Sequence, residues 1–244
     1  MNAIETVRAG KFEIPILYLD NHLLGVVKPC NMPVQADSSG DLDLLTALKD
    51  YIRKKFDKPG AVYLGLVHRL DRPVGGAMIF ARTSKAAERL SREFSAHSME
   101  KRYLAVVKGV LSAPMTLTDY LVKDAKTGMV RVCGADTLGA KEARLRTKPI
   151  ASQNGTTLVE VALMTGRAHQ IRVQHMNAGF PLWGDNRYGG GRPGEQIALW
   201  GAHLGLIHPT KKEEMRFDAL PPMDKQPWKR FDAAVWAREG KIFL

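Results

Sequence analysis

Residues 66–90, LVHRLDRPVGGAMIFARTSKAAERL, place a cluster of charged side chains directly before an apolar run. The run GAMIFAR, residues 76–82, is short and begins at a glycine, which is typical of a buried strand. Ser84 follows at a position suited to a helix N-cap. The stretch therefore predicts a strand and then an amphipathic helix, with a core-facing stripe of Ala86, Leu90 and Phe94.

The segments before this stretch predict two strands and another helix. ILYLDNHLLGVVKP, residues 16–29, indicates two short strands around an Asp–Asn turn. In residues 41–56 apolar side chains recur every four positions, behind Asp41 or Asp43 as N-cap. The predicted helical stripe is Leu44, Leu48, Ile52 and Phe56.

The segments after it predict a strand-rich second half. KRYLAVVKG, residues 101–109, and TTLVEVALMTG, residues 156–166, each indicate a strand, the second ending at Gly166. The hydrophobic pattern of residues 167–179, RAHQIRVQHMNAG, fits both a helix and a strand. We favour a short helix ending at Gly179, because a strand would follow the preceding strand with no residues left for the chain to reverse direction. Strands mixed irregularly with a few helices predict an α+β fold.

The composition indicates a basic protein able to bury a core. The chain has 244 residues, a hydrophobic fraction of 45% and a formal charge of +11, so its surface attracts polyanions, among which nucleic acid is the commonest. Cys30 and Cys133 form no CxxC pair, which argues against a disulfide framework or a structural zinc site. With no leader pattern and no membrane-spanning stretch, we expect a single cytoplasmic domain over residues 1–244.

The charged cluster before the strand contains the first candidate for chemistry. Asp71 lies at a junction of predicted core elements, where a carboxylate needs a partner. Arg69 and Arg72 are the local candidates and Arg172 is a distant one. A carboxylate held ionised by a guanidinium is a poor general acid but can act as nucleophile or base, which argues against a glycosidase.

Other catalytic classes find little support. The histidine spacings include no HExxH, so we expect no metal, and a GxSxG nucleophile motif is absent. GDNRYGGGRPG, residues 184–194, lacks the strand and helix of a phosphate-binding loop, and its glycines indicate loop flexibility.

Three stretches together resemble the RluA-type pseudouridine synthases. HRLDRPVGG (68–76) is similar to the catalytic motif, residues 101–109 to the tyrosine strand, and TGRAHQIRVQHMNAGFPLWGDNRYG (165–189) to the arginine motif. The likeness extends through residues 16–29 and 208–222, so it covers a core of about 14–222. It implies a long mixed, mostly antiparallel sheet with flanking helices and a central basic cleft for RNA, in one catalytic domain without a separate N-terminal RNA-binding domain.

The resemblance also implies the reaction and its residues. A uridine in RNA is isomerised to pseudouridine without cofactor or metal, Asp71 is the essential carboxylate, Arg172 is its salt-bridge partner and Tyr103 stacks on the target base. Arg69 fills the gap left by the flipped nucleotide. Candidate substrate contacts beside it are His68, Arg167 and His169.

Departures from the family pattern leave a second function open. The usual threonine-serine-glycine after the motif is replaced by Val74, Gly75 and Gly76, and Trp200 alters the usual leucine-histidine-alanine. The alternative is a non-catalytic RNA-binding or ribosome-assembly protein that retains the cleft. In either case we expect a monomer whose partner is ribosomal or transfer RNA, with no membrane contact.

Overall fold

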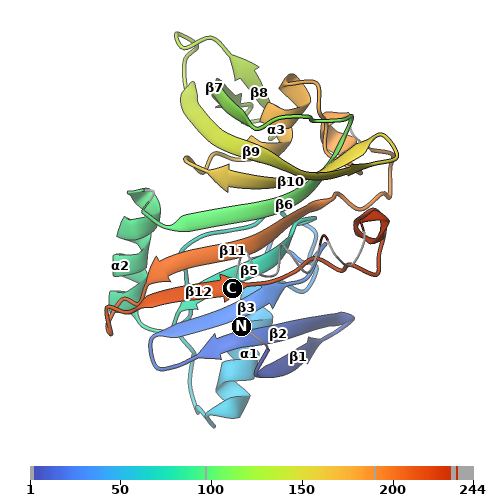
Figure 1. Ribbon diagram of the computed structural model, residues 1–244. Coiled ribbons are helices and arrows are strands. Elements are labelled where there is room, and N and C mark those ends of the chain that lie inside the picture. The colour runs from blue at the N-terminus through green and yellow to red at the C-terminus, as the bar shows by residue number, and fades with distance from the viewer. Residues whose placement is uncertain (1–2, 97, 190, 232–234, 236–244) are drawn as a thin grey trace. The chain divides into compact units, whose positions relative to one another are not determined.

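The computed structural model describes residues 3–96, 98–189, 191–231 and 235, and the chain divides into two compact units. Unit 1 comprises Met1–Glu100 and Gly201–Ala219, and unit 2 comprises Lys101–Trp200 and Leu220–Leu244. Each unit contains a sheet and few helices (Figure 1), which confirms the α+β class. The single catalytic domain stays a prediction. Across the described ranges, none of the helices combines the length and the apolar character needed to cross a bilayer.

The sheet of unit 1 is built on the predicted N-terminal hairpin. Its strands are β1 (Glu5–Ala9), β2 (Phe12–Leu19), β3 (Leu23–Lys28), β4 (Gly65–Leu66), β5 (Gly75–Ala81), β11 (Leu199–Ile207, from Gly201 on) and β12 (Glu214–Asp218). β1, β2, β3 and β5 pair in that order and antiparallel, and β11 and β12 follow. The short β4 also pairs with β5. Both strands predicted within residues 16–29 are confirmed.

Two helices belong to unit 1, α1 (Leu44–Lys55) and α2 (Ser84–Ser95). Asp43 caps α1, because its side chain accepts a hydrogen bond from the backbone N–H of Thr46 at 3.0 Å. The Ser84 cap predicted for α2 is wrong by one residue. Thr83 is still extended and its hydroxyl accepts from the N–H of Ala86 at 3.2 Å, so Ser84 already belongs to the first turn.

The predicted apolar stripes are buried except at their last residues. Leu48 and Leu90 are inaccessible to solvent, as the spacing predicts. Phe56, however, is 43% exposed, because it is the C-cap of α1 and its backbone has left the helical conformation. Its ring instead packs against the guanidinium of Arg82, with 4.6 Å between Cζ and the ring centroid.

β5 is buried along its whole length, and one glycine at its start sets the path of the chain. Gly76 has φ +133°, and a Cβ there would lie 2.3 Å from the carbonyl oxygen of Gly201 in β11. Only glycine permits this approach. The apolar core of unit 1 then continues through Ile79, Leu204 and Phe217, and the chain that follows Asp71 is directed into it.

Unit 2 contains five antiparallel strands. Its strands are β6 (Glu100–Lys108, from Lys101 on), β7 (Met115–Lys123), β8 (Val130–Cys133), β9 (Lys141–Gln153) and β10 (Thr156–Leu163). Their spatial order is β6, β10, β9, β7 and β8. β10 ends before the predicted Gly166, because Met164 and Thr165 both donate their N–H groups to the carbonyl of Arg144 and turn the chain.

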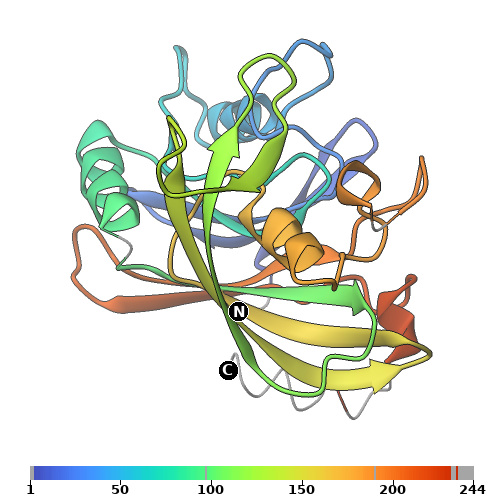
Figure 2. The same cartoon turned by 90° about the horizontal axis from the view of Figure 1, so that it is seen from above.

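Among its described residues, unit 2 also contains a helix and two short 3-10 turns. They are α3 (Gln170–Asn177), η1 (Asn186–Tyr188) and η2 (Trp228–Arg230). The helix favoured for residues 167–179 is confirmed, and Gly179 ends it at φ +83°. α3, orange in Figure 2, packs against β7 and β8. It also buries His175 completely, and the Thr147 hydroxyl lies 3.3 Å from Nε2 of that histidine.

The burial of His175 predicts an acid-dependent loss of stability. Burial lowers the pKa of His175 to about 4, from 6.5. Between these values the unfolded chain holds one proton more than the folded chain, so the unfolding free energy decreases by about 1.4 kcal/mol per pH unit as the pH falls. We expect His175→Gln to remove about 2 kcal/mol of the difference between pH 6.5 and 5, measured by urea unfolding. An equal pH difference in both proteins would contradict the assignment.

Candidate active site

Asp71 begins a tight turn that leads into β5. The N–H of Val74 donates to the Asp71 carbonyl at 2.9 Å and closes the turn. Leu70 and Val74 are buried, so apolar side chains anchor the chain on both sides of the carboxylate. Asp71 itself is half-buried. Its side chain is therefore carried by an anchored turn and not by a solvated loop.

A buried lysine that the sequence analysis missed holds the same turn. Lys28, the last residue of β3, is 0% exposed. Its ammonium donates to the carbonyls of Pro29 at 3.0 Å, Arg72 at 3.0 Å and Val74 at 2.7 Å. An ammonium has three N–H donors, so these three carbonyls use all of them. The signal in the sequence is a lysine that ends an otherwise apolar strand.

The charge of Lys28 is electrostatically linked to Asp71. Burial lowers the pKa of Lys28 to about 7, while the nearby Cys30 and Asp71 oppose this shift and Arg72 adds to it. The Asp71 carboxylate thus favours the charged lysine, and the lysine in turn provides a positive charge on the core side of the turn. Val74 is one of the residues at which the sequence departs from the family pattern. Its backbone carbonyl still accepts a hydrogen bond from Lys28, so the substitution does not remove this support of the turn.

The two arginines of the motif differ in their surroundings. Arg72 was expected as a local partner of Asp71, but its guanidinium forms a very short contact with the Asp41 carboxylate and donates to Ser39 Oγ at 3.0 Å. Asp37 lies 3.7 Å away on the same side. Arg72 therefore fixes the loop before α1 to the turn. Arg69 is exposed, which suits a side chain that reaches toward a ligand.

His68 is oriented by contacts inside unit 1. Its Nε2 accepts a hydrogen bond from the N–H of Ile79 at 3.0 Å, and its ring stacks on Phe94 of α2 at 4.6 Å between centroids. Since Nε2 is an acceptor, the proton of the neutral imidazole is on Nδ1. These contacts account for the histidine structurally, and its predicted role toward substrate stays a prediction.

In unit 2, Arg172 forms a buried, bidentate ion pair with Asp185. Nε and Nη2 donate to the two carboxylate oxygens at 2.8 and 2.7 Å. The two side chains are 7% and 1% exposed. Two parallel charge-assisted hydrogen bonds fix the plane of the guanidinium. In the sequence Asp185 is one residue within the stretch 165–189, so its function as the partner of Arg172 was missed, and the pairing of Arg172 with Asp71 stays a prediction.

A tyrosine next to this ion pair connects it to His169. The guanidinium carbon of Arg172 lies 5.1 Å from the centroid of the Tyr188 ring. The Tyr188 hydroxyl accepts from the N–H of Val130 at 3.0 Å and lies 2.7 Å from Nδ1 of His169. Burial raises the pKa of Tyr188. The hydroxyl therefore keeps its proton, and its hydrogen bond with Nδ1 orients this half-buried imidazole.

The glycine-rich segment 184–194 is tightly packed at its start, which corrects the expectation of loop flexibility. Gly184 has φ +71°, and a Cβ there would lie 2.2 Å from the carbonyl oxygen of Gln196. A Cβ on Gly191 would lie 2.4 Å from the carbonyl carbon of Gly184. Gly190 lies outside the described residues. The glycines allow the close approach of backbone that positions Asp185.

The remaining predicted residues of unit 2 lie on or near the α3 side of its sheet. Tyr103 on β6 is directly opposite Val161 on β10, which in turn is opposite Thr147 on β9, so all three point to one face. Thr147 contacts His175 of α3, so this is the face that α3 covers. Tyr103 is half-buried there. The structure thus places Tyr103 and Arg172 on the same side of the sheet.

Arg167 is held by the loop that precedes α3. Its N–H donates to Gln170 Oε1 at 3.0 Å and its Nε donates to the carbonyl of Glu142 at 2.8 Å. Gln170 also receives the Thr165 hydroxyl at 2.8 Å. These hydrogen bonds fix the conformation of the loop. The bond to Glu142 uses only Nε of Arg167 and not its two terminal guanidinium nitrogens.

Sequence comparisons identify related proteins over most of the chain. The family described as RNA pseudouridylate synthase matches residues 22–178. Ribosomal large subunit pseudouridine synthase D of Zymomonas mobilis is 33% identical over 225 residues, covering 87% of this chain and 71% of the relative. Ribosomal large subunit pseudouridine synthase C of Salmonella typhi is 32% identical over 222 residues, covering 86% and 67%.

Two solved structures share the fold. Human RNA Pseudouridylate Synthase Domain Containing 4 superposes with a TM-score of 0.71 at 20% identity, over 88% of this chain and 90% of that one. Human RNA Pseudouridylate Synthase Domain Containing 1 gives 0.69 at 24% identity, over 86% and 84%. At these identities the likeness concerns the fold alone.

The hydrogen bonds of Lys28 predict that its removal loosens the turn at Asp71. Lys28→Met keeps the length of the side chain but leaves three carbonyls unsatisfied, each at a cost of about 1–3 kcal/mol, while the cost of burying a charge is relieved. We expect a net loss of roughly 2–4 kcal/mol in chemical denaturation. The exposed Lys58→Met is the control. Equal stability of the two variants would refute the role of Lys28.

The buried ion pair predicts a loss of stability when its carboxylate is replaced. Asp185→Asn leaves the Arg172 charge buried with a neutral partner, and breaking a buried pair costs about 3–5 kcal/mol. The matched control is Glu13→Gln, which breaks the exposed pair of Glu13 with Arg8 and changes stability by less than about 1 kcal/mol. Urea unfolding of both variants measures the contrast. A similar small change in both would show that Asp185 does not stabilise Arg172.

Proposed function

The chain belongs to the RNA pseudouridylate synthase family, and from this premise we propose that it isomerises a uridine of large-subunit ribosomal RNA to pseudouridine. The single observation that carries the proposal is the catalytic-type motif at Asp71, held in the anchored turn described above. The choice of RNA is supported by the relatives from Zymomonas mobilis and Salmonella typhi, whose names specify the ribosomal large subunit. We place the reaction in the cytoplasm, where a ribosomal RNA substrate is found.

We assign the essential carboxylate to Asp71. The reaction breaks the N-glycosidic bond, turns the uracil and joins its C5 to the ribose, so positive charge develops on the sugar when the bond breaks. A carboxylate stabilises that charge or attacks the sugar carbon. Support comes from the rigid turn: Lys28 and the buried Leu70 and Val74 hold the backbone, so little reorganisation is needed when the charge develops.

We assign the stacking surface for the target base to Tyr103. Extruding a uridine from folded RNA costs a few kcal/mol of stacking. Stacking of the base on an aromatic ring returns about 1–3 kcal/mol. The half-buried position of Tyr103 on β6 supports the assignment, because part of its surface remains accessible. The exposed Arg69 is proposed to fill the space in the RNA, since a guanidinium both stacks and binds phosphate.

Arg172 is proposed to supply a fixed positive charge to the active site. The Asp185 carboxylate and the Tyr188 ring hold its guanidinium from two sides. Such a side chain loses little entropy on binding substrate. Arg167 and His169 are proposed as RNA contacts, and they lie on the fixed loop that leads into α3.

The proposal is tested by mapping pseudouridine at base resolution in ribosomal RNA from cells that lack the gene. Wild type should restore the missing site, and Asp71→Asn should not, because an amide lacks the carboxylate charge. The exposed Asp136→Asn is the matched control and should restore it. Restoration by Asp71→Asn would overturn the catalytic assignment. If cells that lack the gene lose no pseudouridine site, while the purified protein binds RNA tightly, the result would favour an RNA-binding assembly factor.

A further inference from the structure

The sheet of unit 2 has two faces of different chemistry. The face covered by α3 carries Ala143, Leu145 and Thr147 of β9, all of them buried. Along the same strand the intervening side chains point the other way, since side chains alternate in a strand. These are exposed and mostly basic, and they include Arg144, Arg146 and Lys148.

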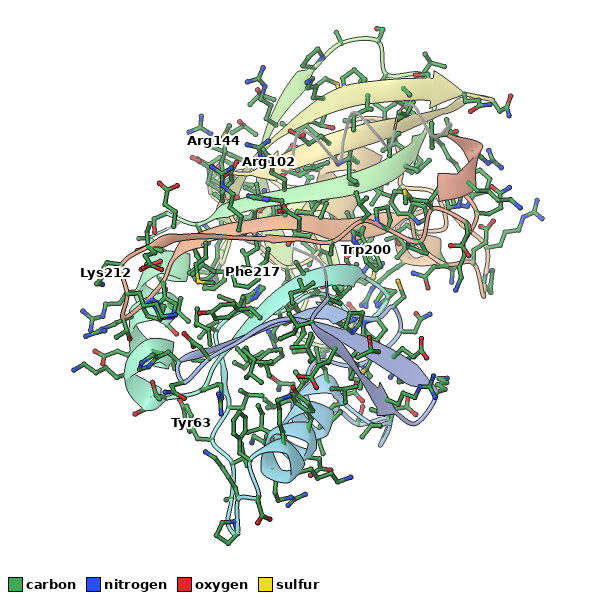
Figure 3. All side chains as sticks on the ribbon, turned by 60° about the horizontal axis from the view of Figure 1, so that its bottom comes forward. Tyr63, Arg102, Arg144, Trp200, Lys212 and Phe217 are labelled. Atoms are coloured by element: carbon green, nitrogen blue, oxygen red, sulfur yellow. The ribbon has the colours of Figure 1, made fainter. Side chains whose placement is uncertain are left out.

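The register of the neighbouring strands adds two basic residues to this face. Arg146 is opposite Ala162 of β10, and Ala162 is opposite Arg102 of β6. On the other side, β7 connects β9 to β8, where Arg131 pairs with Val122 and points to the same face. We name this surface the arginine face and define it as Arg102, Arg131, Arg144, Arg146 and Lys148. Figure 3 labels Arg102 of β6 and Arg144 of β9, and β10 lies between these two strands.

Threonines lie directly across the strand pair from two of these basic residues. On β7, Arg144 is opposite Thr118 and Arg146 is opposite Thr116. Glu142 lies 4.0 Å from Arg144, and its side chain is half exposed like that of the arginine. Lys148 is opposite Glu160. With two acidic and five basic groups the face keeps an excess of positive charge, although neighbouring like charges destabilise a sheet.

We propose that the arginine face binds the phosphate backbone of the substrate RNA, at a segment distinct from the one that contains the target uridine. This inference takes one point from the proposed function, namely that the substrate is RNA. The face lies opposite the α3 side, on which Tyr103 and Arg172 are found. A nucleotide at Tyr103 therefore does not contact the arginine face, and a different part of the same RNA must do so.

The residue types and their spacing fit a polyphosphate. Arg144 and Arg146 are two residues apart, which is about 7 Å along a strand, and β6 is two strands from β9, about 10 Å away. These separations are close to the Debye length of about 8 Å at physiological salt, so the charges reinforce each other. Arginine forks bind phosphate oxygens in pairs. The exposed Thr116 and Thr118 add neutral hydroxyl donors of the kind that contact nucleic-acid backbones.

The test measures RNA affinity against salt concentration for a variant that combines Arg131→Gln, Arg144→Gln and Arg146→Gln. The probe is large-subunit ribosomal RNA purified from cells lacking the gene. Losing three phosphate contacts should weaken binding by roughly tenfold or more and reduce the slope of log affinity against log salt by about 2. The single-turnover rate at saturating RNA should stay at the wild-type value, because none of these residues is assigned to the reaction.

Two further variants control for charge and for folding. Arg8→Gln, Arg53→Gln and Arg92→Gln together remove the same charge from exposed arginines of unit 1, each of which already has an acidic partner. They should leave the slope unchanged, and an equal loss in both variants would overturn the inference. The variant Arg131→Lys, Arg144→Lys and Arg146→Lys should keep the slope and lose only part of the affinity, which excludes misfolding as the cause.

The outcomes also separate this inference from the proposed function. Wild-type affinity and slope in the glutamine variant, with pseudouridine still formed, would overturn the inference alone. Binding that depends on the arginine face, in a wild-type protein that forms no pseudouridine in this RNA, would support the inference and overturn the proposed function.

Discussion

The buried ammonium of Lys28 is the constraint on which the position of Asp71 depends. Three backbone carbonyls of the turn region surround it, and two of them belong to residues 72 and 74. Removing an ammonium from water is costly, and the carbonyl dipoles and the negative charge of Asp71 offset that cost. A carboxylate can thus be held at the edge of an apolar core, because the same lysine satisfies the turn and balances the charge.

Arg172 in unit 2 shows another solution to the same physical problem. Lysine is a point charge, so three separate carbonyls can satisfy it, whereas arginine presents a planar fork that matches one carboxylate. Asp185 provides that carboxylate, and Gly184 allows the backbone approach that brings it there. In both units the cation inside the structure is fixed by groups that leave it no rotational freedom.

Periodicity in the sequence predicted the elements, while the partners of charged side chains depended on tertiary structure. The helix at α1 followed from local spacing, and Asp43, the cap that the structure shows, was one of the two candidates, because helix and cap depend on neighbours within one turn. The resemblance pointed to Asp71 and Arg172 but not to the residues that support them. Lys28 meets its carbonyls 44 and 46 positions away, and Arg72 pairs with Asp41, 31 positions away. No local pattern encodes such separations.

The location of the positive charges, more than their sum, indicates where a polyanion can bind. The formal charge of +11 includes Lys28 and Arg172, whose hydrogen bonds are directed to carbonyls and to a carboxylate inside the protein. It also includes exposed arginines that already have an acidic partner on an adjacent turn or strand. Arg146 differs, because a threonine lies opposite it and its side chain is exposed. Counterion release comes from charges of this last kind.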